Sequence, residues 1–179
     1  MNTSDEALAQ AAAAGDRDAF AALLARHYDR LFAFACRLTG TRDQAEDLTQ
    51  DICAALPRKL AGFRAEARFT TWLYRVAVNA AHDRRRRAAS HARAADGWGD
   101  WELNRRAAND EDTAAQDWLA QAMRALPDDL RDTLALVLGE DLSQAEAAQV
   151  LDISPGTVAW RMSEVKRRLR EMHATEERT

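Results

Sequence analysis

The chain has 179 residues, of which 47% are hydrophobic and only three are proline, so it is too apolar for a disordered protein and fits one large or two small domains. Its net charge of −4 by itself argues against a nucleic-acid-binding protein. The basic side chains are concentrated in two short runs, 84–87 and 161–170, and local patches of this kind contact phosphate.

Alanine is abundant and no stretch alternates with period two, so we predict an all-α fold. No apolar run approaches the roughly 20 residues that span a bilayer and no signal-peptide core begins the chain, which predicts a cytoplasmic protein without membrane insertion. Cys36 and Cys53 lie in apolar helical patterns and are too few for a disulfide framework.

Motifs for catalysis are missing from the sequence. The four histidines are scattered, no CxxC occurs, and neither GxxxxGK[ST] nor GxGxxG is present. We therefore expect no metal, no cofactor and no enzymatic activity.

Two helices are predicted at the start of the chain. Ser4 can cap the first, which ends at Gly15, and Asp16 can cap a longer one that ends at Gly40. Apolar residues recur at helical spacing along the second helix, which makes it core material.

A third helix, residues 42–61, begins with polar and acidic residues that share one surface: Glu46, Asp47, Gln50 and Asp51. Carboxylates suit a helix N-terminus because of the helix dipole, but these exceed that need, which favours a docking face for a basic partner. Pro57 should kink or end the helix.

A loop at 62–68, anchored by Phe63, leads into a helix that starts near Phe69 with Thr70 or Thr71 as its cap. One face of this helix carries an aromatic, an amide and charged residues: Trp72, Arg75, Asn79, Asp83 and Arg86. Such a face suits single-stranded nucleic acid, because bases stack on the ring and cations follow phosphate. The alternative is that Trp72 and Tyr74 are half-buried core residues and the arginine run is a solvated helix end.

Residues 88–113 are polar and acidic, which predicts a linker in which Trp98 and Trp101 dock on this chain or on a partner. Two supporting helices follow, near 113–126 and 127–139. The second should bury Leu130, Leu134, Val137 and Leu138 and end at Gly139.

Residues 142–172 have the pattern of a helix-turn-helix. Ser143 and Glu146 form a capping box for a small first helix, and Ser154 and Pro155 start a second helix. The apolar stripe of that second helix comprises Val158, Met162, Val165 and Leu169. Its remaining faces are basic, and a helix of this kind reads the DNA major groove, although a helical hairpin with a solvated basic face would show the same pattern.

The arrangement resembles the extracytoplasmic-function group of sigma-70 RNA polymerase sigma factors. The resemblance covers roughly residues 10–88 and 114–173 and is carried by three motifs in order: DQAEDLTQDI at 43–52, RKLAGFRAEARFTTWLYRVAVNAAHDRRRR at 58–87, and LPDDLRDTLALVLGEDLSQAEAAQVLDISPGTVAWRMSEVKRRLR at 126–170. It implies a region 2 domain at 1–88, a linker at 89–113 that threads toward the polymerase channel, and a region 4 domain at 114–179. The implied partners are core RNA polymerase, through its largest and second-largest subunits, promoter DNA and an anti-sigma factor.

The resemblance also implies residue roles. It assigns core polymerase binding to Glu46, Asp47, Gln50 and Asp51. It assigns recognition and opening of the −10 element to Phe63, Glu66, Arg68, Trp72, Arg75, Asn79, Asp83 and Arg86. It assigns the −35 element to Ser154, Gly156, Thr157, Trp160, Arg161, Ser163, Lys166 and Arg167.

The chain departs from the family pattern at several positions. Pro57 stands where an aromatic residue is usual, and Trp160 replaces a small one. Ala159 and Glu164 stand where basic residues are common; Glu164 would weaken phosphate binding or accept from a cytosine amino group.

Two other functions fit parts of the sequence. A helix-turn-helix regulator that acts without polymerase would need neither the acidic face nor the Trp–Asn–Arg helix. A helical adaptor that binds only protein would not need the basic recognition face.

Overall fold

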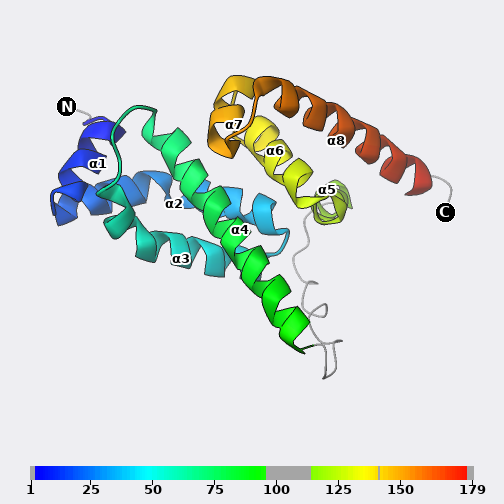
Figure 1. The fold of residues 1–179 in the computed structure, drawn as a ribbon, viewed down its shortest axis with the longest axis horizontal. Coiled ribbons are helices and arrows are strands. Elements are labelled where there is room, and N and C mark those ends of the chain that lie inside the picture. Colours follow the sequence, from blue (N-terminus) through cyan, green and yellow to red (C-terminus); the bar gives the residue numbers. More distant parts are fainter. Residues whose placement is uncertain (1–2, 96–113, 141, 177–179) are drawn as a thin grey trace.

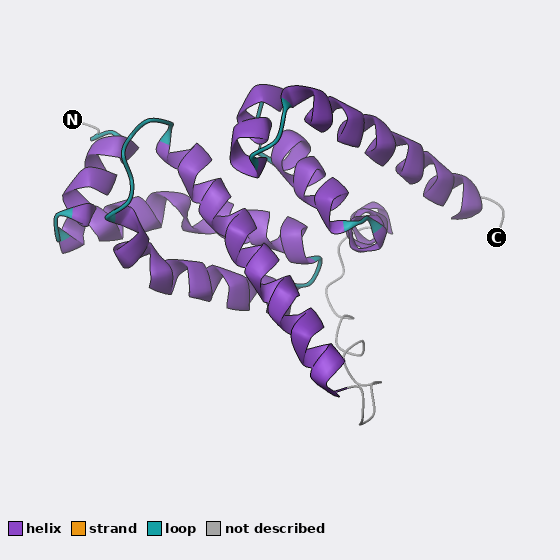
Figure 2. Cartoon of the chain, in the orientation of Figure 1, coloured by secondary structure: helices purple, strands orange, loops and turns teal. Residues whose placement is uncertain are grey.

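The computed structural model describes residues 3–95, 114–140 and 142–176. These residues form eight α-helices and no strand, which confirms the predicted all-α class (Figure 2). The first four helices are α1 Asp5–Ala13, α2 Arg17–Thr39, α3 Arg42–Leu60 and α4 Phe69–Ala95. The second four are α5 Ala114–Ala125, α6 Asp128–Gly139, α7 Gln144–Leu151 and α8 Pro155–Glu176.

The N-terminal bundle, α1–α4, is started by local capping as the sequence predicts. The Ser4 side chain accepts from the Ala7 amide at 3.2 Å, and Asp16 accepts from the Asp18 amide at 2.9 Å. Gly40 ends α2 with a φ of 76°, a left-handed conformation that glycine adopts without steric cost. The bundle core includes Phe34, Leu48, Ile52, Leu60 and Tyr74.

Two boundary predictions in this bundle were wrong. Of the two outcomes predicted for Pro57, a kink or the end of the helix, the second is wrong, since Pro57 lies inside α3 and the helix continues to Leu60. Neither threonine caps α4, which begins at Phe69; the Phe69 amide instead donates to the Glu6 carboxylate of α1 at 3.1 Å. A distant element therefore satisfies the helix start, a contact that sequence spacing does not reveal.

The C-terminal bundle, α5–α8, contains the predicted helix-turn-helix. The Ser143–Glu146 capping box is formed at the start of α7, and the Ser154 hydroxyl accepts from the Thr157 amide at 3.1 Å at the start of α8. In the α8 stripe Val158, Met162 and Val165 are buried, whereas Leu169 is partly buried.

The predicted burial along α6 is partly wrong. Leu130 and Leu134 are buried as expected and Val137 is partly buried, but Leu138 is 67% exposed. Leu136 is fully buried in its place. α6 therefore also buries the face that carries Leu136, which was not predicted from the sequence.

The two bundles pack directly against each other (Figure 1). α6 packs on α2, and α7 packs along α4, which crosses the molecule as its longest helix. We call this contact surface, which is formed by α2 and α4 of the first bundle and α6 and α7 of the second, the seam. α4 reaches Ala95, beyond the predicted boundary at residue 88, while Trp98 and Trp101 of the predicted linker lie outside the described residues.

Within the described ranges, no helix has the length and apolarity needed to cross a membrane.

Candidate nucleic-acid interface

The acidic face of α3 is present and exposed. Glu46, Asp47, Gln50 and Asp51 all reach solvent, and Asp47 and Asp51 retain 65% and 55% side-chain exposure. Arg84 of α4 bridges the two aspartates, with nitrogen–oxygen distances of 3.1 Å to Asp47 and 2.6 Å to Asp51. The arginine run of α4 thus partly neutralises this face, which the sequence did not predict.

An aromatic cluster lies where the loop 61–68 meets α4. Phe63, Phe69 and Trp72 contact one another with ring centroids 5.4–5.8 Å apart, and Phe63 and Trp72 are only partly buried. Trp72 is therefore not the fully exposed stacking platform considered from the sequence. It is an aromatic side chain anchored at one face and partly open to solvent.

Of the other predicted −10 residues, Glu66, Arg68, Arg75 and Asn79 are exposed. Asp83 and Arg86 are paired with each other one helical turn apart. Arg75 donates to the carbonyl oxygen of Gln149 in α7, so part of the face that carries Asn79 is in contact with the C-terminal bundle.

The predicted −35 residues run from Ser154, directly before α8, to Arg167 near the middle of the helix. The Ser154 and Thr157 hydroxyls are 2.9 Å apart, and Trp160 is 63% exposed. The Arg161 guanidinium lies 3.6 Å from Asp129 of α6 and retains 19% side-chain exposure. Gly156, Ser163 and Lys166 are exposed, and Ser163 also donates to the Ala159 carbonyl at 3.1 Å.

Glu164 does not stand free to meet a base. Its carboxylate accepts from Arg167 at 2.6 Å and from Arg168 at 2.8 Å, and these hydrogen bonds lower its pKa to about 2. Arg167 is held in addition by Glu171. Glu164 therefore fixes the orientation of Arg167 and Arg168 and neutralises part of their positive charge.

The most deeply buried charges lie at the seam, and the sequence reading missed them. Asp132 of α6 and Glu140, the residue that follows α6, each have 1% side-chain exposure. Asp132 and Glu140 lie four residues before and four residues after the buried Leu136. Asp132 shares a face of α6 with Leu136, and Glu140 follows the helix end at Gly139. This four-residue spacing is the sequence signal for a second buried face, but no neighbouring residue indicates which element packs on that face.

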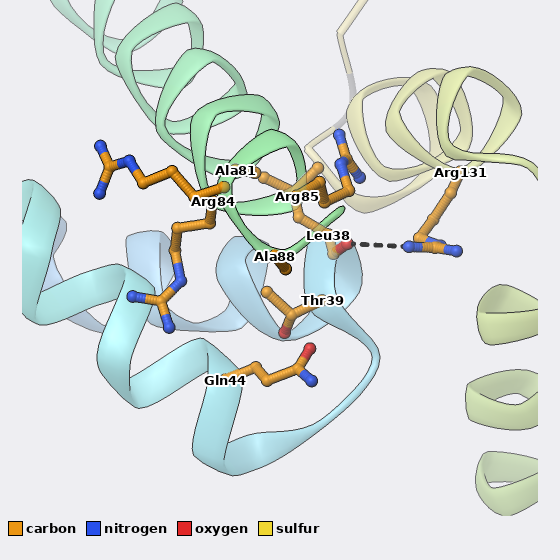
Figure 3. Close-up of a pocket in the computed structure, with 9 residues that line it drawn as sticks. Leu38, Thr39, Gln44, Ala81, Arg84, Arg85, Ala88 and Arg131 are labelled. Carbon is orange, nitrogen blue, oxygen red and sulfur yellow. Dashed lines mark hydrogen bonds between the residues drawn. The ribbon is translucent and has the colours of Figure 1, made fainter. Parts of the chain in front are cut away.

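A cavity of about 370 Å³ lies at one end of the seam (Figure 3). Its lining includes four arginines: Arg84, Arg85 and Arg87 of α4 and Arg131 of α6. Arg131 crosses to the N-terminal bundle and donates to the Leu38 carbonyl at 3.4 Å.

Comparison with known proteins identifies the family. The model of sigma-70 region 2 matches residues 23–91, and the model of sigma-70 region 4 matches residues 116–169. The chain is 34% identical to the ECF RNA polymerase sigma factor SigM of Mycobacterium tuberculosis, over 93% of this chain and 83% of that protein.

Two solved structures share the fold of both bundles. The sigma factor RpoE of Bartonella quintana, in complex with the anti-sigma factor NepR, is 26% identical with a TM-score of 0.72, covering 87% of this chain and 96% of that one. CnrH, in complex with the cytosolic domain of CnrY, is 28% identical with a TM-score of 0.69, covering 97% of this chain and 99% of that one. The chain therefore belongs to the sigma-70 family, as an RNA polymerase sigma factor of the extracytoplasmic-function group.

Proposed function

We propose that residues 1–88 act as the region 2 domain and residues 114–179 as the region 4 domain, with 89–113 as the linker between them. The first domain would bind core RNA polymerase and open the −10 element, and the second would bind the −35 element as duplex. The protein would act in the cytoplasm, where polymerase and promoter DNA are found, without catalysing a chemical step.

The polymerase contact is assigned to the acidic face of α3. Four exposed polar and acidic residues on one helix offer a basic partner several charge-assisted contacts at once. Arg84 holds two of these carboxylates, so a polymerase arginine or lysine would have to displace it or share them.

The −10 contact is assigned to α4 and the loop before it. The exposed Asn79 and Arg75 supply an amide and a cation, and the partly open Trp72 supplies a ring edge or face for an unstacked base. Opening the duplex costs a few kcal/mol per unstacked base, which contacts of this kind must offset.

The −35 contact is assigned to the first half of α8. Its capped start presents Ser154 and Thr157, followed by the exposed Trp160, at the end of the helix that meets base edges in helix-turn-helix proteins. The distal arginines, held by Glu164 and Glu171, suit phosphate contacts, which position the helix without reading sequence.

An anti-sigma factor is proposed as the regulator. Both structural relatives described above are complexes of a sigma factor with such a partner or with a named cytosolic domain. The observation that carries the whole proposal is the order of the surfaces along one chain: an acidic α3, a polar-aromatic α4 and a capped α8, within the residues that match regions 2 and 4.

The test is promoter-specific transcription with purified core polymerase on linear templates. The wild-type chain should direct initiation, and Asp47→Arg should reduce core binding at least about tenfold, because it replaces an attraction with a repulsion. Asp29→Arg makes the same charge change on an exposed position of α2 and serves as the control.

Two outcomes would contradict the proposal. A chain that binds duplex DNA but leaves core polymerase inactive would be a regulator that works without polymerase. Unchanged core affinity of Asp47→Arg would remove the docking role from α3.

A further inference from the structure

We infer that α1 takes part in −10 recognition through Glu6, whose carboxylate fixes the start of α4 and, with it, the strained loop 61–68. Glu6 is in this sense a positioning residue: it acts on the promoter strand through the loop and α4. This role rests on the −10 function proposed for the loop and α4.

The start of α4 is held by a residue of another helix. Arg68 precedes the helix, and an arginine side chain has no acceptor for the first helical amides. The Phe69 amide donates instead to Oε1 of Glu6 at 3.1 Å, across 63 positions of the chain, and Phe69 itself is buried. A carboxylate at a helix N-terminus is also favoured by the helix dipole. We call this hydrogen bond between Glu6 and Phe69 the anchor.

A second contact of α1 supports the same residue. The Asp5 carboxylate lies 2.8 Å from Nε2 of His27 on α2, and the His27 ring packs against the Phe69 ring with centroids 5.2 Å apart. Asp5 also pairs with Arg26 at 3.0 Å, which holds α1 against α2. Two adjacent residues of α1 therefore support Phe69, one through its backbone amide and one through its ring.

The loop that ends at α4 contains a strained residue. Ala65 has a φ of 55°, a left-handed conformation that costs alanine free energy and that glycine adopts without this cost. At the start of the loop, the Phe63 amide donates to the Leu60 carbonyl at 2.9 Å. Residues 64–67 make no hydrogen bond with any described residue. The conformation of the loop is therefore set at its two ends.

Both ends of the loop meet at the aromatic cluster. Phe63, at the start, lies 5.8 Å from Phe69 and 5.4 Å from Trp72 between ring centroids, and α1 lies beside the loop (Figure 1). A strained residue persists only where its surroundings fix the backbone. The anchor supplies this constraint at the end of the loop that leads directly to Trp72 and Arg75, two of the proposed −10 contacts.

The charge of Glu6 separates positioning from simple electrostatics. DNA is a polyanion, so removal of a carboxylate near it raises affinity if only charge matters. If Glu6 positions the loop, Glu6→Ala lowers the affinity although it removes a negative charge. Glu6→Gln makes the same charge change but keeps a carbonyl oxygen that can accept from the Phe69 amide, and so it preserves binding.

The experiment measures binding of the holoenzyme, reconstituted with core polymerase, to a fluorescent single strand. The strand carries the −10 sequence of a promoter at which the wild-type chain initiates. Glu6→Ala should bind it about tenfold more weakly than wild type, and Glu6→Gln within about twofold of wild type. Asp29→Ala removes an exposed carboxylate of α2 and is the charge control, with wild-type affinity expected. Helix content and core affinity should be unchanged in every variant.

Ala65→Gly is the second test, because it removes the cost of the left-handed conformation. Combined with Glu6→Ala, it should recover about threefold of the lost affinity. Ala61→Gly is the matched control, since Ala61 is exposed in the same loop and has a φ of −58°, at which glycine relieves no strain. A loss of packing alone would not be repaired selectively by the change at Ala65.

Amide hydrogen exchange tests the anchor in the free chain, without polymerase or DNA. In NMR spectra the Phe69 amide should exchange about tenfold faster in Glu6→Ala than in wild type, because it loses its acceptor. Glu6→Gln should retain slow exchange. Unchanged exchange in Glu6→Ala would overturn the anchor.

Outcomes with the strand decide the role in recognition. Wild-type affinity of Glu6→Ala would overturn the inference, and equal losses in Glu6→Ala and Glu6→Gln would reject the hydrogen bond as its cause. Equal recovery with Ala61→Gly and Ala65→Gly would reject the contribution of strain. A wild-type holoenzyme that does not bind the strand would reject the proposed −10 function and the role of Glu6 in it, whereas faster Phe69 exchange in Glu6→Ala would still support the anchor.

Discussion

At the scale of single residues, many of the cations that suit DNA are already paired within the chain. Arg161 faces Asp129, Arg167 faces Glu164 and Glu171, and Arg86 faces Asp83. The pairs of Arg86 and Arg167 are exposed and contribute little to stability, so each of these cations can exchange its partner for a phosphate or a base at small cost, whereas Arg161 retains only 19% side-chain exposure. Their main effect is to orient the cation before DNA arrives.

Arg161 is the residue at which base and phosphate contacts can be told apart. Arg161→Ala should weaken binding to a −35 duplex by about 1–3 kcal/mol if the guanidinium meets a base edge, and relax the preference for one base pair. Binding titrations on a set of single-base-pair variants of the duplex would measure this.

The control for this titration is Arg170→Ala, an exposed arginine further along the same helix. An equal loss on every duplex would make Arg161 a phosphate contact. No loss on any duplex would mean that Arg161 of the wild-type chain stays paired with Asp129 when DNA is bound and contacts no DNA.

At the scale of elements, local chemistry sets most helix starts and ends. Ser4, Asp16, Ser143 and Gly40 act as the sequence predicts because each cap involves residues within four positions along the chain. The exceptions are α3, which continues through Pro57, and α4, whose first amide, that of Phe69, donates to the carboxylate of Glu6 in α1. In both, packing against the bundle outweighs the local preference.

Pro57→Ala tests how much α3 loses by carrying a proline. Pro57 is exposed and lacks the amide hydrogen that an interior helix position uses. Alanine should raise the free energy of unfolding by about 1–3 kcal/mol, as measured by urea denaturation. The control, Arg58→Ala at the next exposed position, should change the free energy of unfolding little. A lower free energy of unfolding for Pro57→Ala would contradict the prediction and would mean that the proline shapes the end of α3 for core packing.

At the scale of the whole molecule, the seam joins the surfaces proposed for −10 and −35 recognition through buried charge. Tyr74 donates its hydroxyl to the Glu140 carboxylate, which also accepts from Arg30 and Arg37 of α2. Burial and its hydrogen bond to Glu140 raise its pKa well above the ordinary value of 10.0, although Arg30 and Arg37 act in the opposite direction. The tyrosine hydroxyl is a donor in the folded chain and would be a second negative charge beside Glu140 after ionisation.

Stability should therefore fall in strongly alkaline solution. A group whose pKa is raised in the folded state contributes fully below its unfolded value, here 10.0, and loses that contribution as the pH rises further. Urea denaturation of the wild type from neutral pH to above pH 10 should show a steeper loss than Tyr74→Phe, in which the titrating hydroxyl is absent. Lysine residues titrate in the same range, so the difference between the two chains is the relevant quantity. Parallel losses would exclude Tyr74 as the cause.

Local patterns are enough to predict the all-helical class, most of the caps, the helix-turn-helix and the acidic row on α3, because each depends on residues within one or two helical turns. Packing between distant segments determines that Trp72 contacts Phe63 and Phe69, that Arg84 pairs with Asp47 and Asp51, and that Leu136 rather than Leu138 is buried. It also decided that Asp132 and Glu140 are buried charges with partners about 50 to 110 residues away. The physical reason is that a helical pattern shows which residues share a face, whereas the element that covers that face is set by chain folding between distant segments.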